Sequence, residues 1–404
     1  MSDYARMVSM KNELLKAFEE FGKEDAVTEC DRYLFSVCTD LVVRGFRNPE
    51  NAILTGMFMP CELFQAFDLT PLCAEMLAMY IASSSKSRLM IEKAEGSGIS
   101  ETYCSFHKIV MGAGECGLFE GLAGIVNCSL ACDADNLTYR VLSHKYFYPQ
   151  YYLDVPYGKS ESSVEYVVDQ LHELCASLEN LAGKKLDEEK LKEICARSRK
   201  TKENFRRIME YRKNRTLHQS MKSYWMEMCL IKNMCGTPEA LEYSERKLRE
   251  WEKAEEYSGH KLVWMHCMPF LCSSVKDIVE ANDDLQIAVT ELGSDALFVS
   301  DSNDLFRSMA ESLVYDSYNG SCYDRTAHVV KLAELAGADG AVCFCQWGCK
   351  QTCGASVLMK EAIEKNGYPV LLLNGDAADY ENSPDGQIST RLGAFAEMLR
   401  EKSI

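Results

Sequence analysis

The 404-residue sequence lacks the features of a membrane or secreted protein. No apolar run approaches the roughly eighteen residues that a membrane-spanning helix requires. The first residues, MSDYARMVSMKNELLKAFEEFGKED, are polar and charged, with neither the apolar core nor the cleavage site of a secretory signal. We therefore expect a cytoplasmic protein that has no membrane partner.

Positive charge is also scarce. The chain has 44 Lys and Arg residues against 61 Asp and Glu residues, a formal net charge of -17. Such a field repels nucleic-acid phosphates, so nucleic acid is not an expected partner. The phosphate-binding pattern G-x4-G-K-[ST] is absent, which excludes a P-loop nucleotide hydrolase. The stretch GAGECG at 112–117 follows a helix-like segment and no strand, so we expect a helix end there and no dinucleotide site.

Paired C-x2-C knuckles, the usual mark of structural zinc, do not occur, although the chain contains 19 cysteines. An odd number of thiols in a reducing compartment is no disulfide framework. Buried cysteine behaves as a small apolar residue, and this explains the cysteines in helical, amphipathic surroundings. These are Cys30, Cys38, Cys175, Cys195, Cys229 and Cys235.

The order of apolar and periodic segments predicts an α/β protein. The apolar run at 52–59 ends at Pro60, and a helical pattern follows; the run at 122–130 shows the same succession, and a further strand lies within 146–158. Long charged helices fill the middle of the chain. Strands are expected again at 261–270, 284–292, 337–347 and 368–376. We predict two tandem doubly wound parallel sheets, with domains at 1–159 and 259–404 and a helical subdomain at 160–258.

Six cysteines occupy loops after strands or before helices, where sites form in open parallel sheets. They are Cys61, Cys104, Cys132, Cys322, Cys345 and Cys349. A helix N-terminus favours the thiolate form, which binds soft metals, so these positions suit an iron-sulfur cluster. Buried or redox-active thiols remain the alternative. Cys345, Cys349 and Cys353 are one residue off the radical-SAM spacing, but no β/α barrel surrounds them.

The stretch DGAVCFCQWGCKQTCGASVLMKEAIEKNGYPVLLLNGD, with TYCSFHKIVMGA and NCSLACDADNLTYR, resembles the 2-hydroxyacyl-CoA dehydratase and benzoyl-CoA reductase superfamily. The resemblance implies two tandem flavodoxin-like or Rossmann-like domains and a cubane 4Fe-4S cluster with one open iron. Its three ligands would be Cys104, Cys132 and Cys349.

The additional cysteines Cys61, Cys322 and Cys345 resemble the double-cubane branch of this superfamily, in which two cubanes joined by a sulfide form an 8Fe-9S cofactor. This resemblance implies an oxygen-sensitive, homodimeric reductase of small multiply bonded molecules. Its electrons would come from a separate ATP-hydrolysing activator with its own 4Fe-4S cluster. Two alternatives stay open: a single-cubane subunit of a heteromeric dehydratase that removes water from an acyl-CoA through a ketyl radical, and a cluster or electron carrier without turnover.

Polar residues beside the expected ligands are candidates for catalysis. His107 lies three residues after Cys104, on the same side of a helix, where it would donate a proton or fill the core. Glu62 would donate a proton or compensate a helix dipole. Three others flank the last two ligands, either to order the cluster or as ordinary helix-start groups. They are Gln346, Lys350 and Gln351.

Overall fold

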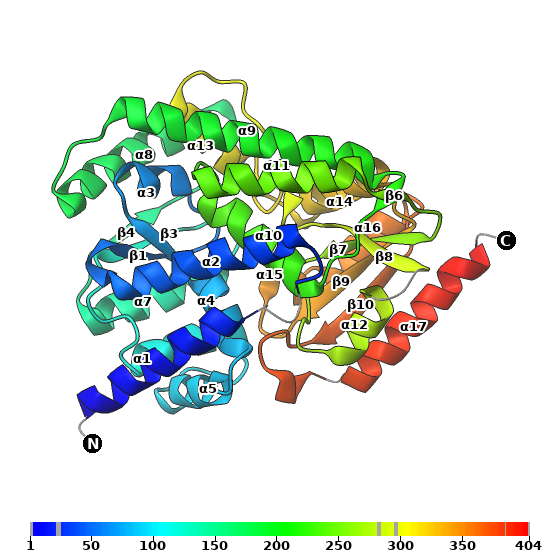
Figure 1. Ribbon diagram of the computed structural model, residues 1–404, viewed down its shortest axis with the longest axis horizontal. Coiled ribbons are helices and arrows are strands. Elements are labelled where there is room, and N and C mark those ends of the chain that lie inside the picture. Colours follow the sequence, from blue (N-terminus) through cyan, green and yellow to red (C-terminus); the bar gives the residue numbers. More distant parts are fainter. Residues whose placement is uncertain (1–2, 22–25, 281–283, 295–297, 384, 403–404) are drawn as a thin grey trace.

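The computed structural model of the chain describes residues 3–21, 26–280, 284–294, 298–383 and 385–402. Its N-terminal half holds a four-stranded parallel sheet in the order β2-β1-β3-β4 (Figure 1). The strands are β1 (Ala52–Thr55), β2 (Thr70–Cys73), β3 (Gly124–Cys128) and β4 (Gln150–Leu153).

The C-terminal half holds a second parallel sheet in the order β10-β9-β7-β8. Its strands are β7 (His260–Met265), β8 (Leu285–Thr290), β9 (Gly340–Gln346) and β10 (Val370–Gly375). When the strands of each sheet are numbered from one to four along the chain, both sheets have the spatial order 2-1-3-4. This is the flavodoxin-like arrangement. The predicted pair of tandem doubly wound folds is confirmed.

The central strands are apolar because both faces of each sheet are covered. Every residue of β1, β3 and β9 is buried, as expected for parallel strands between helical layers. The sequence pattern missed β2, a four-residue edge strand that contains Pro71. Proline in a short run argues against a strand and is tolerated at an edge.

Helices α1 to α7 accompany the first sheet. They are α1 (Asp3–Glu20), α2 (Glu29–Arg47), α3 (Cys61–Ala66), α4 (Ala74–Ala82), α5 (Ser87–Gly96), α6 (Ser105–Glu115) and α7 (Asp133–Tyr146). The predicted helix end at GAGECG is confirmed, since Gly112 and Gly114 lie in the last turns of α6. A Cβ atom at Gly112 would collide with the Met90 carbonyl oxygen, so this glycine lets α5 pack closely on α6.

Helices α12 and α14 to α17 accompany the second sheet, whereas α13 packs on α8 (Glu161–Ala182). The bounds of these helices are α12 (Ser273–Val279), α13 (Leu305–Val314), α14 (Cys322–Ala336), α15 (Lys350–Cys353), α16 (Ser356–Glu364) and α17 (Asp385–Lys402). A two-stranded antiparallel pair, β5 (Arg215–Thr216) and β6 (Glu255–Glu256), lies apart from both large sheets. Short 3-10 turns occupy Pro49–Asn51 and Tyr380–Asn382.

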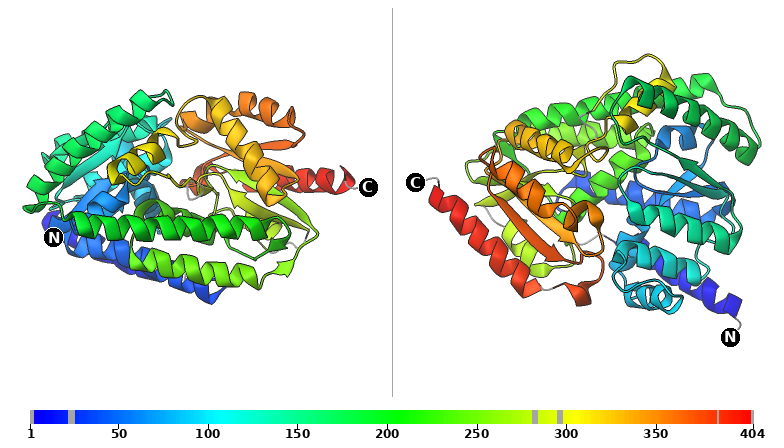
Figure 2. Two further views of the ribbon diagram at one scale, coloured as in Figure 1. Left: turned by 90° about the horizontal axis from the view of Figure 1, so that it is seen from above. Right: turned by 180° about the vertical axis from the view of Figure 1, so that it is seen from behind.

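The middle of the chain forms α8 (Glu161–Ala182), α9 (Glu188–Arg212), α10 (Met221–Met234) and α11 (Pro238–Glu252). Helix α9 contacts α3 in the first half and α14 in the second, and α11 packs beside part of it (Figures 1 and 2). Helix α10 packs against α2. These helices therefore join the two halves, while the domain boundaries at 159 and 258 stay a prediction.

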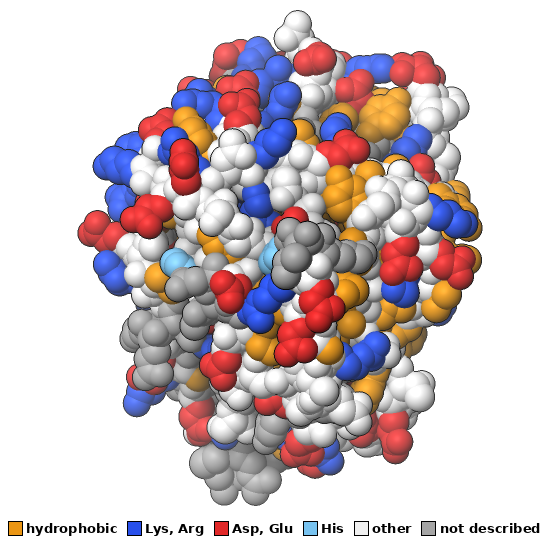
Figure 3. All heavy atoms as spheres, turned by 90° about the vertical axis from the view of Figure 1, so that its right-hand side faces the viewer, with side chains coloured by type: hydrophobic (Ala, Val, Ile, Leu, Met, Phe, Trp, Pro, Cys, Tyr) orange, Lys and Arg blue, Asp and Glu red, His pale blue; other side chains and the backbone are white. Residues whose placement is uncertain are grey.

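The surface carries both signs of charge. On the face shown in Figure 3, acidic and basic side chains are interspersed among polar and apolar ones. None of the helices in the described ranges is long and apolar enough to cross a membrane.

Candidate iron-sulfur site

The carboxyl ends of the two parallel sheets meet in the middle of the molecule. The Gln351 Nε2 group donates to the Ala131 carbonyl oxygen at 2.7 Å, which joins α15, the short helix after β9, to the loop after β3. The Ser105 hydroxyl donates to Asp376 Oδ2 at 2.5 Å, joining α6 to the loop after β10. In open sheets, ligands bind where the strand order reverses, here between β1 and β3 and between β7 and β9. The two hydrogen bonds therefore bring the expected binding positions of both sheets together at one junction.

Three of the predicted ligands open helices at this junction. Cys104, Cys132 and Cys349 are the N-cap residues of α6, α7 and α15, and none of their side chains makes a capping hydrogen bond. The unpaired N–H groups of a helix start favour an anionic sulfur. Burial raises the pKa of Cys132, and the charges of Asp135, Glu75, Cys104 and Cys349 raise it further, so the three sulfurs lie within electrostatic reach of one another.

Gly348 allows the loop of Cys349 to approach Cys104. Its φ is +77°, and a Cβ atom there would lie 2.6 Å from the Cys104 backbone nitrogen. Any side chain at this position would push the two cysteine loops apart.

Two non-glycine residues in the left-handed region flank the site. Ala131 has a φ of 66° and immediately precedes Cys132, and His266 has a φ of 67° and immediately follows β7. Such conformations are disfavoured for side chains with a Cβ and persist where the surroundings impose them, often at functional sites. The Gln351 bond to the Ala131 carbonyl is one such restraint.

His266 is the immediate partner of Cys349. Its Nε2 atom lies 3.6 Å from the Cys349 sulfur. Burial acts to raise the pKa of Cys349, but the His266 ring and hydrogen bonds from Thr352 lower it to about 6. The thiolate form of Cys349 therefore predominates at neutral pH.

His107 is the partner of Cys132. Its Nε2 atom lies 3.3 Å from the Cys132 sulfur, and its Nδ1 atom lies 3.1 Å from the Thr138 hydroxyl oxygen. Burial lowers the pKa of His107 to about 4, so the ring is neutral at physiological pH. His107, Cys132 and Asp135 offer ligand atoms that all lie within 4.8 Å of one another, a spacing at which they could hold a metal ion.

A buried carboxyl pair lies behind His107. Asp135 Oδ1 is 3.7 Å from His107 Nε2, and burial together with the Glu75 charge raises the pKa of Asp135. Burial also raises the pKa of Glu75, whose Oε2 accepts from the Cys73 thiol at 3.1 Å. Both carboxyl groups therefore hold protons more readily than exposed ones.

The other three predicted ligands have separate surroundings. Cys345 is buried in β9, and hydrogen bonding with Cys343 lowers the pKa of Cys345 to about 7, with Cys349 among the charges that act on it. Cys322 is the first residue of α14, partly exposed, and packs on the core cluster that contains Cys345. Cys61, the first residue of α3, donates to the Cys235 carbonyl oxygen at 3.3 Å. Their role as ligands stays a prediction.

The predicted polar residues also differ in placement. Lys350 is 80% exposed and pairs with Asp133 at 3.2 Å, beside Cys132. Gln346 is fully buried and accepts from the Ala377 backbone N–H at 2.8 Å, so its amide orders the loop after β10. Glu62 is buried and accepts from the Ser198 hydroxyl at 2.6 Å.

Sequence reasoning missed His266, Glu75 and Asp135. His266 had a usable signal, because it directly follows an expected strand at the edge where sites form. Glu75 and Asp135 had none, since their proximity depends on the packing of α4 and α7.

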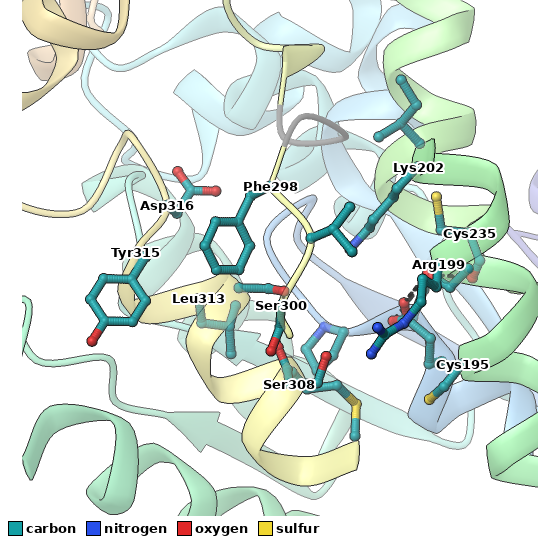
Figure 4. A pocket seen from close by; sticks show the side chains of 18 of the residues that line it. Cys195, Arg199, Lys202, Cys235, Phe298, Ser300, Ser308, Leu313, Tyr315 and Asp316 are labelled. Carbon is teal, nitrogen blue, oxygen red and sulfur yellow. Dashed lines mark hydrogen bonds between the residues drawn. The ribbon is translucent and has the colours of Figure 1, made fainter. Parts of the chain in front are cut away.

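A cavity of about 750 Å³ opens beside this junction. Its lining includes the segment 57–62 after β1 and Leu130 after β3, together with side chains of α9, α10, α13 and α14 (Figure 4). Cys61 and Glu62 face this cavity, so they lie where a small molecule would enter.

A family model described as 2-hydroxyglutaryl-CoA dehydratase, D-component, matches residues 56–399. The chain belongs to this family. The resemblance found in the cysteine motifs is thereby confirmed, as is the expectation of an enzyme.

Relatives of this dehydratase-family chain are distant but cover most of its length. It is 22% identical to the alpha chain of the (R)-phenyllactyl-CoA dehydratase of Clostridium sporogenes, over 85% of this chain and 88% of that one. It is 23% identical to the alpha chain of the lactoyl-CoA dehydratase of Anaerotignum propionicum, over 84% and 88%. It is 25% identical to one of the component chains of the benzoyl-CoA reductase of Thauera aromatica, over 84% and 87%.

Proposed function

We propose that this chain is an iron-sulfur enzyme that holds a cluster on Cys104, Cys132 and Cys349. The observation that carries the proposal is the convergence of three helix-capping thiols from both sheets at one junction. Thiolates are the usual ligands of such clusters, and helix N-termini support their charge.

The residues around the thiols suit a cluster. Gly348 leaves space for the loops to close, and three polar groups contact the thiols or their loops: His107, His266 and Gln351. When bound, a cluster with an open iron would supply low-potential electrons to a small molecule. His107 would donate a hydrogen bond to the Cys132 sulfur, and His266 would stabilise the Cys349 thiolate.

We further propose that Cys61, Cys322 and Cys345 complete a double cubane of composition 8Fe-9S. Two features support this: Cys345 lies four residues before Cys349 and is within reach of its charge, and Cys61 and Cys322 each begin a helix. The enzyme would then be a homodimeric reductase of small multiply bonded molecules, with Glu62, Lys350 and Gln346 as neighbouring groups. Its electrons would come from an ATP-hydrolysing 4Fe-4S activator protein.

Iron and sulfide analysis of anaerobically purified protein tests both parts. We expect about eight irons per chain, and loss of iron in Cys104→Ser but not in the core control Cys38→Ser. About four irons, unchanged in Cys345→Ser, would reject the double cubane and leave the single cluster. No iron under strictly anaerobic conditions would reject the whole proposal.

The dehydratase activities of the relatives favour a second candidate, a single-cubane subunit of a 2-hydroxyacyl-CoA dehydratase. This candidate requires a heteromeric partner and turnover of a 2-hydroxyacyl-CoA. Assay of the purified homo-oligomer with activator and ATP separates the two, because only the reductase should reduce a small molecule when the activator is the one other protein present.

A further inference from the structure

Three cationic side chains gather in the 750 Å³ cavity beside the cysteine junction. Arg199 and Lys202 extend into it from α9, as Figure 4 shows, and Lys232 lines it from α10. Arg199 and Lys202 are three residues apart on one helix, so their side chains project from the same face.

The contacts of Arg199 leave its charge available. Arg199 Nη2 donates to the carbonyl oxygen of Ser302, which carries no net charge. No carboxylate among the described residues lies within ion-pair distance of Arg199. Lys232 lies 4.1 Å from the centre of the Phe58 ring, and its Nζ atom is 4.0 Å from Asp316 Oδ2.

The cavity is lined by more basic than acidic residues, whereas the whole chain has more acidic ones. The described residues that line the cavity include seven Lys or Arg against four Asp or Glu, in a protein of net charge -17. Burial lowers the pKa of Lys232; the Asp316 carboxylate opposes this effect, and the Lys202 ammonium group adds to it. The Glu62 carboxylate acts on Lys202 and raises its pKa. These two carboxylates offset only part of the positive charge of the seven basic residues, and a bound anion would offset more of it.

We propose that this cavity binds the oxyanion group of the substrate through Arg199, Lys202 and Lys232. The proposal rests on the reductase function above and names the class of its substrate. The anionic group would sit against α9 and α10, and the rest of the molecule would extend toward the apolar segment 57–59 and Leu130, next to the cysteine loops. The oxyanion could belong to a small carboxylate or to the phosphate of a larger carrier.

Anaerobic isothermal titration calorimetry with succinate, inorganic phosphate and pyrophosphate tests the proposal at low ionic strength. We expect saturable binding of at least one anion, weakened about tenfold or more in Arg199→Gln and Lys202→Gln and largely retained in Lys202→Arg. Arg206→Gln is the matched control, because Arg206 is an exposed residue of the same helix outside the cavity. Preference for succinate would indicate a carboxylate substrate, and preference for pyrophosphate would indicate a phosphate-bearing one.

Two outcomes would overturn the inference: no saturable binding of any of the three anions, or equal weakening in Arg206→Gln and the cavity variants. Iron analysis of the same preparations separates this result from the fate of the cluster. Protein with full iron that binds no anion would reject the oxyanion site alone. Iron-free protein with the expected variant pattern would support the site and reject the iron-sulfur function.

Discussion

The three cysteines at the junction, Cys104, Cys132 and Cys349, differ in the direction in which their surroundings shift the pKa of the thiol. The pKa of Cys349 is lowered to about 6 against the effect of burial, chiefly by the His266 ring. Burial raises the pKa of Cys104 and of Cys132. Thiols bind metals as thiolates, so cluster assembly must remove protons from Cys104 and Cys132, whereas Cys349 is already ionised. Cys349 is therefore the expected first point of attachment.

At His107, replacement by phenylalanine should lower the midpoint potential of the proposed cluster. We assign the proton to Nε2, because Nδ1 faces the Thr138 hydroxyl, so the ring donates to the Cys132 sulfur. A hydrogen bond that is about 1 kcal/mol stronger to the reduced cluster corresponds to about 40 mV for one electron. Redox titration followed by electron paramagnetic resonance measures this.

The matched control is His144→Phe, since His144 is an exposed residue of α7. Its potential should equal that of the wild type. Equal potentials for His107→Phe and the wild type would show that the imidazole does not interact with the cluster.

Lys232 gives the stability of the protein a dependence on alkaline pH. Burial lowers its pKa from 10.5 to about 8, so between these values the unfolded chain binds more protons than the folded one. The free energy of unfolding therefore gains a contribution that rises with pH through this range. Relative to Lys232→Met, the wild type should gain about 3 kcal/mol between pH 7.5 and pH 10.5.

Urea denaturation at several pH values measures this difference. Arg206→Met serves as the control, because an exposed arginine stays charged throughout the range and its difference should remain constant. A constant difference for Lys232→Met as well would mean that Lys232 has an ordinary lysine pKa.

Among the helices and strands, the sequence predicted those that are marked by a local pattern of apolar residues. Apolar runs marked seven of the eight strands of the two large sheets, and loop placement brought Cys104, Cys132 and Cys349 to helix starts. It missed β2, because a four-residue edge strand with a proline has no clear pattern. It also missed the pairing of His266 with Cys349 and of Asp135 with Glu75, because these contacts join elements far apart in the chain.

The loop between β9 and α15 should tolerate no side chain at Gly348. In Gly348→Ala, the new Cβ atom would meet the Cys104 backbone at 2.6 Å, at a φ of +77°. We expect a loss of at least about 2 kcal/mol in unfolding free energy and fewer irons per chain. Chemical denaturation and iron analysis measure both effects.

Gly393→Ala in α17 is the control, because no atom lies within 4 Å of the added Cβ. Alanine at that helical position should leave iron unchanged and raise stability by up to about 1 kcal/mol. If Gly348→Ala behaved in the same way, the loops of Cys104 and Cys349 could not be as close as described.

For the whole molecule, the proposed cluster would act as a link between halves. Its ligands come from α6 and α7 in the first half and from the loop after β9 in the second. Removal of iron by anaerobic chelation should lower the melting temperature, because a group that binds only the folded state stabilises it. Hydrogen exchange should rise at 102–105, 131–133 and 347–351, while α17 stays protected. Uniform exchange before and after chelation would contradict a linking role.

Helix α9 contacts both halves of the molecule. Its 25 residues contact α3 in one half and α14 in the other, and its Arg199 and Lys202 side chains point into the cavity between them. Each residue of an α-helix advances it by about 1.5 Å and turns it by about 100°. A change in length by one residue would therefore rotate one end of α9 away from its partner. The insertion or deletion of one residue in α9 would thus change both the shape of the cavity and the direction in which Arg199 and Lys202 point.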